Sequence, residues 1–136
     1  SRICLELDAK LIVVTSPRTS VDIKETLENN LNCDFHIFDY NNEKDNNPYH
    51  ACLGYGDFFI ITGDSVSMIS ECCTLSKPVF IFDRSAISSK KHKIFHEYLY
   101  QNKHAFEMIK GLSCENDIES VALNEAKRIA GELNEF

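Results

Sequence analysis

The residues best suited to chemistry in this sequence form one short polar segment after an apolar run. Positions 58–61 are all apolar, and Thr62, Gly63, Asp64 and Ser65 follow them. A strand that is buried on both faces lacks polar alternation, so the apolar run predicts an interior strand of a parallel sheet. The polar residues predict a sharp turn and a capped helix start, whose free amides attract anions such as phosphate. We interpret this segment as a ligand-binding corner of an α/β sheet, because such sheets bind ligands at the carboxyl ends of their strands.

The helix predicted after this turn carries a second polar feature. Ser67 and Glu71 are four residues apart and therefore share one helix face. Most of the other residues in this helix are apolar, so Glu71 either meets hydrogen-bond donors in a polar cleft or lies on a solvent-exposed stripe. A carboxylate beside a nucleotide commonly accepts hydrogen bonds from ribose hydroxyls, and we assign this role to Glu71.

A second polar loop predicts a further phosphate contact. Ser16, Arg18 and Thr19 lie between a predicted strand and a predicted helix, at the same edge of the sheet as Gly63. Hydroxyls, a guanidinium group and helix-start amides together suit a phosphate. The alternative is ordinary helix capping by Thr19 or Ser20, with Arg18 in solvent.

Short strands alternate with helices along the chain. The predicted strands are residues 11–15, 34–38, 57–62 and 78–82, and the predicted helices are residues 21–31, 48–55, 65–75, 91–102 and 118–133. Asn47 is expected to cap the helix that begins at Pro48. The alternation predicts the α/β class, with a Rossmann-like, doubly wound parallel sheet.

The same pass along the chain predicts one domain. Residues 1–136 contain no repeats, no low-complexity tracts and no internal boundary. The chain begins without Met and its first strand follows a short lead-in. We therefore expect a C-terminal fragment of a larger, two-domain protein.

The composition limits the classes of function. With 136 residues, 43% of them hydrophobic and 26% charged, the chain is typical of soluble globular proteins. Its apolar runs are far too short for a transmembrane segment, and its net charge of −7 argues against a nucleic-acid surface. The six cysteines show neither a disulfide-framework spacing nor a Cys-x-x-Cys pair. This indicates reduced, buried thiols in a cytoplasmic protein and gives little support to a zinc site.

Two other patterns lack features that their chemistry needs. His92 and His96 are four residues apart on a predicted helix but form no His-Glu-x-x-His motif, so we predict no metal site. Gly54 and Gly56 begin like a dinucleotide fingerprint, yet they precede a strand and Phe59 replaces the third glycine. The second pattern therefore weakens a dehydrogenase or epimerase interpretation.

Several of these motifs resemble a known family. The pattern Asp-Ser-x-Ser-Met-x-Ser-Glu at 64–71, Asn-Pro-Tyr at 47–49 and Lys-Pro-Val at 77–79 resemble the C-terminal domain of the bacterial and plant family named for the mitochondrial fission protein "elongated mitochondria". Weaker similarity covers essentially the whole chain. Bacterial members have also been labelled predicted nucleoside-diphosphate-sugar epimerases. The Tyr-x-x-x-Lys spacing that such an enzyme needs, Tyr40 to Lys44, falls in an Asn-rich loop here.

That family is similar to the nucleotide-sugar half of the GT-B glycosyltransferase architecture, in which two Rossmann-like domains face a cleft. The resemblance implies a donor-binding domain that positions a nucleoside-diphosphate sugar for metal-independent transfer. Glu71 would hold the donor ribose, the amides around Gly63 to Ser67 would contact the diphosphate, and the Ser16 loop would form the other wall. The implied ligand-binding set is Ser16, Arg18, Thr19, Gly63, Asp64, Ser65, Ser67 and Glu71.

The resemblance also implies that catalysis needs the N-terminal domain in cis. The acceptor base would belong to that domain, so we name no catalytic residue and no cofactor in this chain. We expect the isolated domain to be inactive. Peripheral membrane contact through the missing part stays open.

The sequence departs from the family pattern at three places. Pro17 stands where the family often has a second arginine, Ser76 replaces a glycine at a helix end, and His104 and Ala105 fall where an arginine is common. Two further hypotheses therefore stay open. One is a non-catalytic interaction module that recruits a protein partner, as the role of the plant relatives in organelle fission implies. The other is a domain that binds nucleotide as a regulatory signal.

Overall fold

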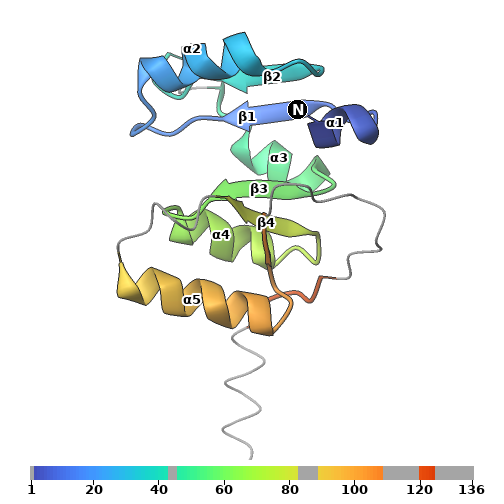
Figure 1. Ribbon diagram of the computed structural model, residues 1–136, viewed down its shortest axis with the longest axis vertical. Helices are drawn as coiled ribbons and strands as arrows, with labels where there is room; N and C mark the ends of the chain where they lie inside the picture. The colour runs from blue at the N-terminus through green and yellow to red at the C-terminus, as the bar shows by residue number, and fades with distance from the viewer. Residues whose placement is uncertain (1, 43–45, 83–88, 109–119, 125–136) are drawn as a thin grey trace, which may run out of the picture. The chain divides into compact units, whose positions relative to one another are not determined.

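The computed structural model describes residues 2–42, 46–82, 89–108 and 120–124 (Figure 1). These residues cluster into two compact units, an N-terminal unit that runs to Gly56 and a C-terminal unit that begins at Asp57. Each unit contains parallel strands connected through helices. This arrangement confirms the α/β, Rossmann-like class that the alternating pattern predicts.

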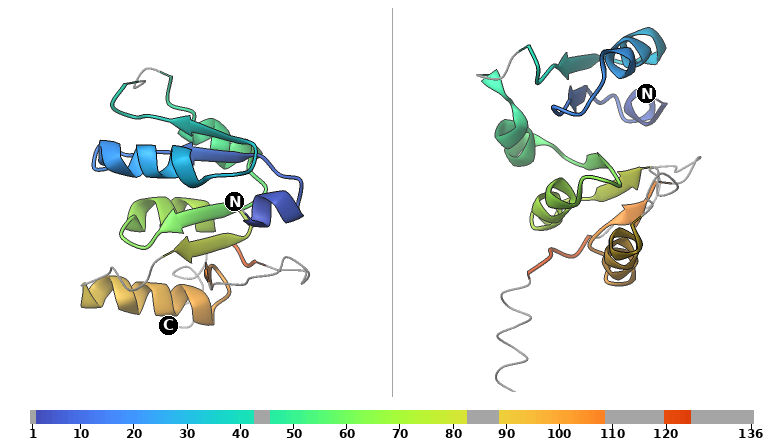
Figure 2. Two further views of the ribbon diagram at one scale, coloured as in Figure 1. Left: turned by 45° about the horizontal axis from the view of Figure 1, so that its top comes forward. Right: turned by 90° about the vertical axis from the view of Figure 1, so that its left-hand side faces the viewer.

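The N-terminal unit is a strand–helix–strand motif flanked by two short helices. Its elements are α1 (Arg2–Glu6), β1 (Leu11–Val14), α2 (Val21–Asn30), β2 (Phe35–Phe38) and α3 (Tyr49–Tyr55). Strands β1 and β2 pair in parallel, with Leu11 opposite Phe35 and Val14 opposite Phe38. Parallel strands need a crossover connection, and α2 supplies it. Figure 2 follows this path in two further views.

The C-terminal unit is a three-stranded parallel sheet with two helices. Its elements are β3 (Phe59–Thr62), α4 (Val66–Cys73), β4 (Val79–Phe82), α5 (Lys90–Gln101) and β5 (Phe106–Glu107). The strand order is β3-β4-β5. Helix α4 contacts β3 and β4, and α5 contacts β5. The core includes Ile69, Val79, Ile81 and Leu99, whose side chains are fully buried.

Strand β4 shows why its sequence lacks polar alternation. Val79 and Ile81 project to one face of the sheet and are fully buried. Phe80 projects to the other face, where its ring centroid lies 6.3 Å from that of Phe58 and 6.1 Å from that of Phe106. Apolar side chains therefore pack on both faces of this strand.

The prediction of an interior strand concerned the apolar run 58–61, and in β3 it holds only in part. Ile61 is buried there, whereas Ile60 is 39% exposed and β3 is the first strand of the described order.

The structure corrects the predicted start of α3. This helix begins at Tyr49, so Pro48 occupies the N-cap position and not the first helical position. Asn47 still stabilises the helix start, because its Oδ1 accepts a hydrogen bond of 2.9 Å from the Tyr49 amide. The sequence interpretation also missed α1 and the two-residue strand β5.

The predicted helix 118–133 is wrong for its described part. Residues 120–124 form no helix, because their amides bond to other parts of the C-terminal unit. The Val121 amide donates to the Lys103 carbonyl at 2.9 Å, and the Leu123 amide donates to the Cys73 carbonyl at 2.8 Å. The rest of this predicted helix lies outside the described residues.

Left-handed residues follow both long helices of the C-terminal unit. Lys103 has a φ of 58° after α5, where its amide donates to Tyr100 O and the next amide, of His104, donates to Leu99 O. This bonding pattern is a Schellman motif. Ser76 has a φ of 52° after α4, a conformation that favours glycine. The glycine that the resemblance predicts at position 76 would suit this left-handed backbone.

Candidate functional site

The turn after β3 is fixed to the neighbouring strand by backbone hydrogen bonds. The Gly63 amide donates to Phe82 O at 3.0 Å, and the Ser65 amide donates to Thr62 O at 3.0 Å. The Thr62 and Ser65 hydroxyl oxygens are 3.3 Å apart. Gly63 is buried, whereas Asp64 is exposed. The amides of Gly63 and Ser65 are therefore occupied within the protein, and the turn presents Asp64 to solvent.

Helix α4 begins directly after this turn. Ser65 is its N-cap residue, and the Ser65 side chain makes no capping hydrogen bond. The Ile69 amide donates to Ser65 O at 3.0 Å, which is the first bond of the α-helical pattern. The amides of residues 66–68 precede it, and such amides have no acceptor inside an α-helix. These amides, together with the positive end of the helix dipole, form a suitable place for an anion.

The two polar side chains predicted to share a face of α4 are both exposed. Ser67 and Glu71 lie four residues apart on this helix, and each is accessible to solvent. Glu71 thus lies on the exposed stripe of α4. A carboxylate in this position needs no buried donors, and a ligand can reach it.

The opposite side of α4 belongs to the core. Ile69, Cys72 and Cys73 are buried. Burial, with a smaller effect of Glu71, raises the pKa of Cys72 to about 11, and burial together with the neighbouring Cys72 raises the pKa of Cys73 to about 12. Both thiols are therefore protonated at neutral pH. Their burial confirms that part of the prediction for these two cysteines, whereas Cys33 and Cys52 are only partly buried.

The loop after β1 is stabilised by its own hydroxyl groups. The Ser16 amide donates to Thr19 Oγ1 at 3.0 Å, and the Arg18 amide donates to Ser16 Oγ at 3.2 Å. Ser20 occupies the N-cap position of α2 without a side-chain capping bond. Thr19 therefore stabilises the loop instead of the helix. Arg18 is exposed.

The sequence interpretation missed a polar network at the carboxyl end of β2. The Thr15 amide donates to Phe38 O at 3.1 Å, and the buried Thr15 Oγ1 accepts a hydrogen bond of 2.9 Å from the Tyr40 amide. These two contacts join the end of β1 to the end of β2. The predicted strand 11–15 ends in this threonine, and a polar residue at the end of an apolar run was the available signal.

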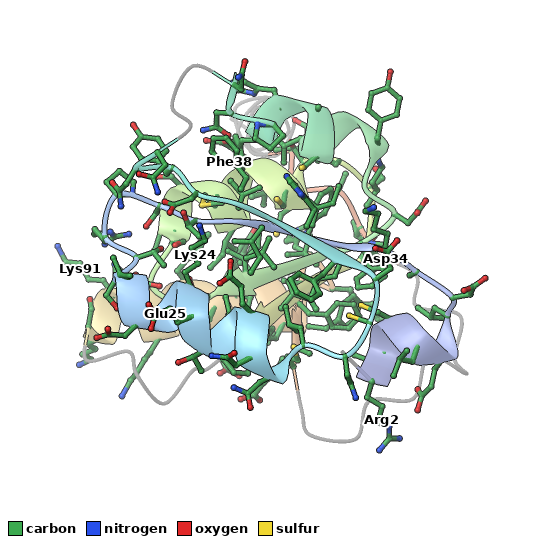
Figure 3. All side chains as sticks on the ribbon, turned by 90° about the horizontal axis from the view of Figure 1, so that it is seen from above. Arg2, Lys24, Glu25, Asp34, Phe38 and Lys91 are labelled. Carbon is green, nitrogen blue, oxygen red and sulfur yellow. The ribbon has the colours of Figure 1, made fainter. Side chains whose placement is uncertain are left out.

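Asp39 is the centre of the same network. Its carboxylate accepts hydrogen bonds from the Asn41 amide at 3.1 Å, from Asn42 Nδ2 at 2.9 Å and from Lys24 Nζ at 3.3 Å. Lys24 extends from α2 (Figure 3). The Asn41 amide, with a smaller effect of Lys24, lowers the pKa of Asp39. This carboxylate is therefore an organising group of the N-terminal unit.

The predicted ligand-binding residues fall into two groups. Gly63, Asp64, Ser65, Ser67 and Glu71 lie on the turn after β3 and on α4. Ser16, Arg18 and Thr19 lie on the loop after β1, in the other unit. Each group lies at the carboxyl end of a parallel strand, which is where α/β sheets bind ligands.

The two residues at which the resemblance predicts an arginine, His104 and Ala105, are buried. His104 Nδ1 lies 2.7 Å from Val121 O and donates to it, because a carbonyl oxygen only accepts. The His104 ring centroid is 5.8 Å from that of Tyr98. Ala105 is fully buried. His104 therefore anchors the segment 120–124 through Val121.

The described residues contain no group of three or more His, Cys, Asp or Glu side chains that could hold a metal ion. His96 is fully buried in α5, whereas His92 is partly exposed. Tyr40 lies in a turn, and Lys44 lies outside the described residues. A membrane-spanning helix is also absent from the described ranges, where no helix has the required length and hydropathy.

Comparison with known proteins identifies the family. A family model described as mitochondrial fission ELM1 matches residues 2–136. An uncharacterized protein of Rickettsia prowazekii is 36% identical over 116 residues, which are 85% of this chain and 33% of that protein. The mitochondrial fission protein ELM1 of Arabidopsis thaliana is 50% identical over 40 residues, which are 29% of this chain and 9% of that protein. The chain thus spans about a third of the Rickettsia relative's length. No solved structure matches it. The chain belongs to the mitochondrial fission ELM1 family.

Proposed function

We propose that this chain is the donor-binding domain of a GT-B-like glycosyltransferase, which holds a nucleoside-diphosphate sugar for metal-independent transfer. One observation supports the proposal most directly. The amides of residues 66–68 precede the first helical bond of α4, and the exposed side chains of Ser67 and Glu71 stand on the same helix. Amides that can donate hydrogen bonds to an anion and a carboxylate that can accept hydrogen bonds from hydroxyl groups are thus combined within two helical turns.

The diphosphate binds at the start of α4 in this proposal. The amides of residues 66–68 and the Ser67 hydroxyl donate to its oxygens, and they stabilise the charge that develops on the departing diphosphate. Gly63 has an indirect role, because its amide already bonds to Phe82 and its missing side chain allows close approach. Asp64 is negatively charged and therefore suits hydroxyl groups of the ligand better than its phosphates.

Glu71 binds the donor ribose. Four residues of α-helix separate Ser67 from Glu71, which corresponds to a rise of about 6 Å along the axis. This spacing lets one ligand contact the amides with its diphosphate and the Glu71 carboxylate with its ribose. The loop of Ser16, Arg18 and Thr19, in the N-terminal unit, carries a guanidinium group and hydroxyls of the kind that bind phosphate.

The decisive experiment compares nucleotides on the full-length protein and on this chain. Amide NMR shifts are followed during titration with UDP, GDP, ADP and CMP. We expect specific shifts at residues 63–71 and 16–19 with one of the four nucleotides, which also identifies the base. The absence of amide shifts at millimolar nucleotide in both proteins would overturn the proposal.

The role of Glu71 is tested by removing its charge alone. Glu71→Gln is expected to weaken nucleotide binding about 10- to 100-fold, because a hydrogen bond to a charged group contributes about 1.5–3 kcal/mol. Transfer from the donor sugar by the full-length protein should be lost. Glu97→Gln on α5 is the matched control, since it removes an exposed helix carboxylate away from the α4 start. Undiminished turnover in Glu71→Gln would refute the assignment.

A second candidate function is a non-catalytic interaction module that recruits a protein partner. The name of the Arabidopsis relative, a mitochondrial fission protein, supports a role in organelle division. Pro17, His104 and Ala105 stand in place of arginines that would bind phosphate, and the last two are buried. Partner binding away from α4, combined with absent nucleotide binding in the full-length protein, would favour this module.

A further inference from the structure

Three lysines lie at the start of α5. Lys90, Lys91 and Lys93 fall within the first four residues of this helix, and all three are exposed. The first turn contains no acidic residue. Cations are unfavourable at this end of a helix because the helix dipole is positive there, and Lys90 and Lys93 are like charges three residues apart on one face. In a chain with a net charge of −7, this cluster is a local exception that does not stabilise its own helix.

The topology of the C-terminal unit places this cluster at the carboxyl edge of the sheet. Strand β4 ends at Phe82, and its parallel neighbour β5 begins at Phe106, so α5 starts at the carboxyl edge and runs back to the amino edge. Helix α4 makes the same return between the parallel strands β3 and β4. Figure 1 shows both helices beginning on the same side, at the arrowhead end of β3. The lysines thus lie at the edge that carries the start of α4.

The starts of α4 and α5 are also neighbours along this edge. The strand order β3-β4-β5 means that both crossovers step in the same direction, and right-handed crossovers then put their helices on one face of the sheet. Helices packed side by side lie about 8–10 Å apart. The turn before α4 is bound to the end of β4, because the Gly63 amide donates to Phe82 O at 3.0 Å. The long, flexible lysine side chains therefore lie within reach of a ligand that extends from the start of α4.

The other basic side chains described in this unit lie at the opposite edge. Residues 57–82, 89–108 and 120–124 contain two further Lys or Arg residues, Lys77 and Lys103. Lys77 precedes β4, and its Nζ lies 5.9 Å from the ring centroid of Phe59, the first residue of β3. Lys103 precedes β5. Within these described ranges, the start of α5 is therefore the place where Lys or Arg side chains lie at the carboxyl edge.

We propose that Lys90, Lys91 and Lys93 bind the second phosphate of the donor and thereby select a nucleoside diphosphate over a monophosphate. This inference rests on the proposed function. Glu71 holds the ribose over α4, so the first phosphate lies at the α4 start and the second extends toward α5. The amides of residues 66–68 are neutral, and transfer without a metal ion leaves the charge of the departing diphosphate to be balanced by side chains. The ammonium groups of the cluster supply this charge.

Paired titrations of the full-length protein test the inference. Calorimetry compares UDP with UMP, GDP with GMP, and ADP with AMP, and CMP is titrated separately. We expect the wild-type protein to bind one diphosphate at least about 10-fold more tightly than its monophosphate. In the variant with Lys90→Gln, Lys91→Gln and Lys93→Gln, affinity for the diphosphate should fall about 10- to 100-fold, while affinity for the monophosphate stays the same. A merely structural role of the lysines would weaken both nucleotides.

Two further variants separate the contacts. Lys103→Ala removes an exposed lysine at the far end of α5 and should leave both affinities unchanged. Glu71→Gln acts on the ribose and should weaken the diphosphate and the monophosphate by the same factor. Circular dichroism confirms that each variant is folded.

The outcomes distinguish this inference from the proposed function. If the triple lysine variant keeps the preference for the diphosphate, the inference is wrong and the donor site at α4 stands. Wild-type protein that binds a monophosphate as tightly as the diphosphate, or that binds CMP alone, also overturns the inference. If the wild-type protein binds none of these nucleotides, both the inference and the proposed function are wrong.

Discussion

At the residue scale, left-handed backbone conformations set the ends of the helices in the C-terminal unit. Ser76 and Lys103 have φ values of 52° and 58°. A residue with a Cβ in this conformation has a close contact with the next carbonyl oxygen, which costs roughly 1–2 kcal/mol. Lys103 nevertheless stabilises α5, because its Schellman motif satisfies the Tyr100 and Leu99 carbonyls. The fold therefore needs these conformations although the sequence supplies no glycine.

Glycine at either position should stabilise the protein. We expect Ser76→Gly and Lys103→Gly each to raise the free energy of unfolding by about 1 kcal/mol, because the close contact disappears. Urea unfolding measures the change. Ser70→Gly, in the middle of α4, is the control and should have the opposite sign, since glycine inside a helix is destabilising by about 0.5–1 kcal/mol. Equal effects at all three positions would contradict the assignment of strain to Ser76 and Lys103.

At the element scale, the N-terminal unit depends on the polar network at the ends of its two strands. Thr15 forms hydrogen bonds with the backbone on both sides of Asp39. The Asp39 carboxylate accepts hydrogen bonds from Lys24 on α2 and from the Asn41 amide in the following turn. Its side chain is 14% exposed, compared with 70% for Asp34 in the ion pair with Lys10. A two-stranded sheet is marginal by itself. These contacts at its end therefore matter more than they would in a larger sheet.

Because the network needs the ionised form of Asp39, this unit is expected to lose stability at acid pH. The folded protein lowers the pKa of Asp39 below its ordinary value of 3.8. A carboxylate whose pKa is lower in the folded protein than in the unfolded chain stabilises the fold at every pH above its unfolded-state pKa. This stabilisation is lost as the pH falls through the pKa of the folded protein. We expect stability to decline as the pH falls below 3.8, and Asp39→Asn to reduce this decline. Asp34→Asn is the control. An unchanged pH profile in Asp39→Asn would contradict the role of this network.

At the scale of the whole molecule, the chain is one part of what its relatives contain. The matched segment covers 33% of the Rickettsia protein, so most of that relative lies outside the similarity. In the proposed function this chain supplies the donor site and the rest supplies the acceptor base. The interpretation of residues 1–136 as a single domain stays a prediction, as does the cytoplasmic location.

This division of roles predicts binding without turnover. We expect the 136-residue chain to bind the nucleotide selected by the titration, and to release no nucleotide from the corresponding donor sugar. Isothermal titration measures the binding, and a coupled assay for free nucleotide measures the turnover. The full-length protein should do both. Turnover by the isolated chain would show that its own residues include a catalytic base.

The local sequence predicted most elements within one or two residues of their observed bounds. Strands β1 and β4 are runs of apolar residues between turn residues, and such runs have few alternatives in a parallel sheet. Helix α5 was predicted from its periodicity and is observed one residue earlier. The short helix α1 and the two-residue β5 were missed, because each is too short for a periodic pattern.

The sequence by itself determined the family, the α/β class and the turn that precedes α4, because motifs, apolar runs and turn residues are local properties. Tertiary structure alone decided the rest. The Gly63 amide is engaged by Phe82 on a different strand, and the segment 120–124 bonds to Lys103 and Cys73 instead of forming a helix. Hydrogen bonds and contacts between distant residues have no local signature, since their geometry exists only after the chain has folded.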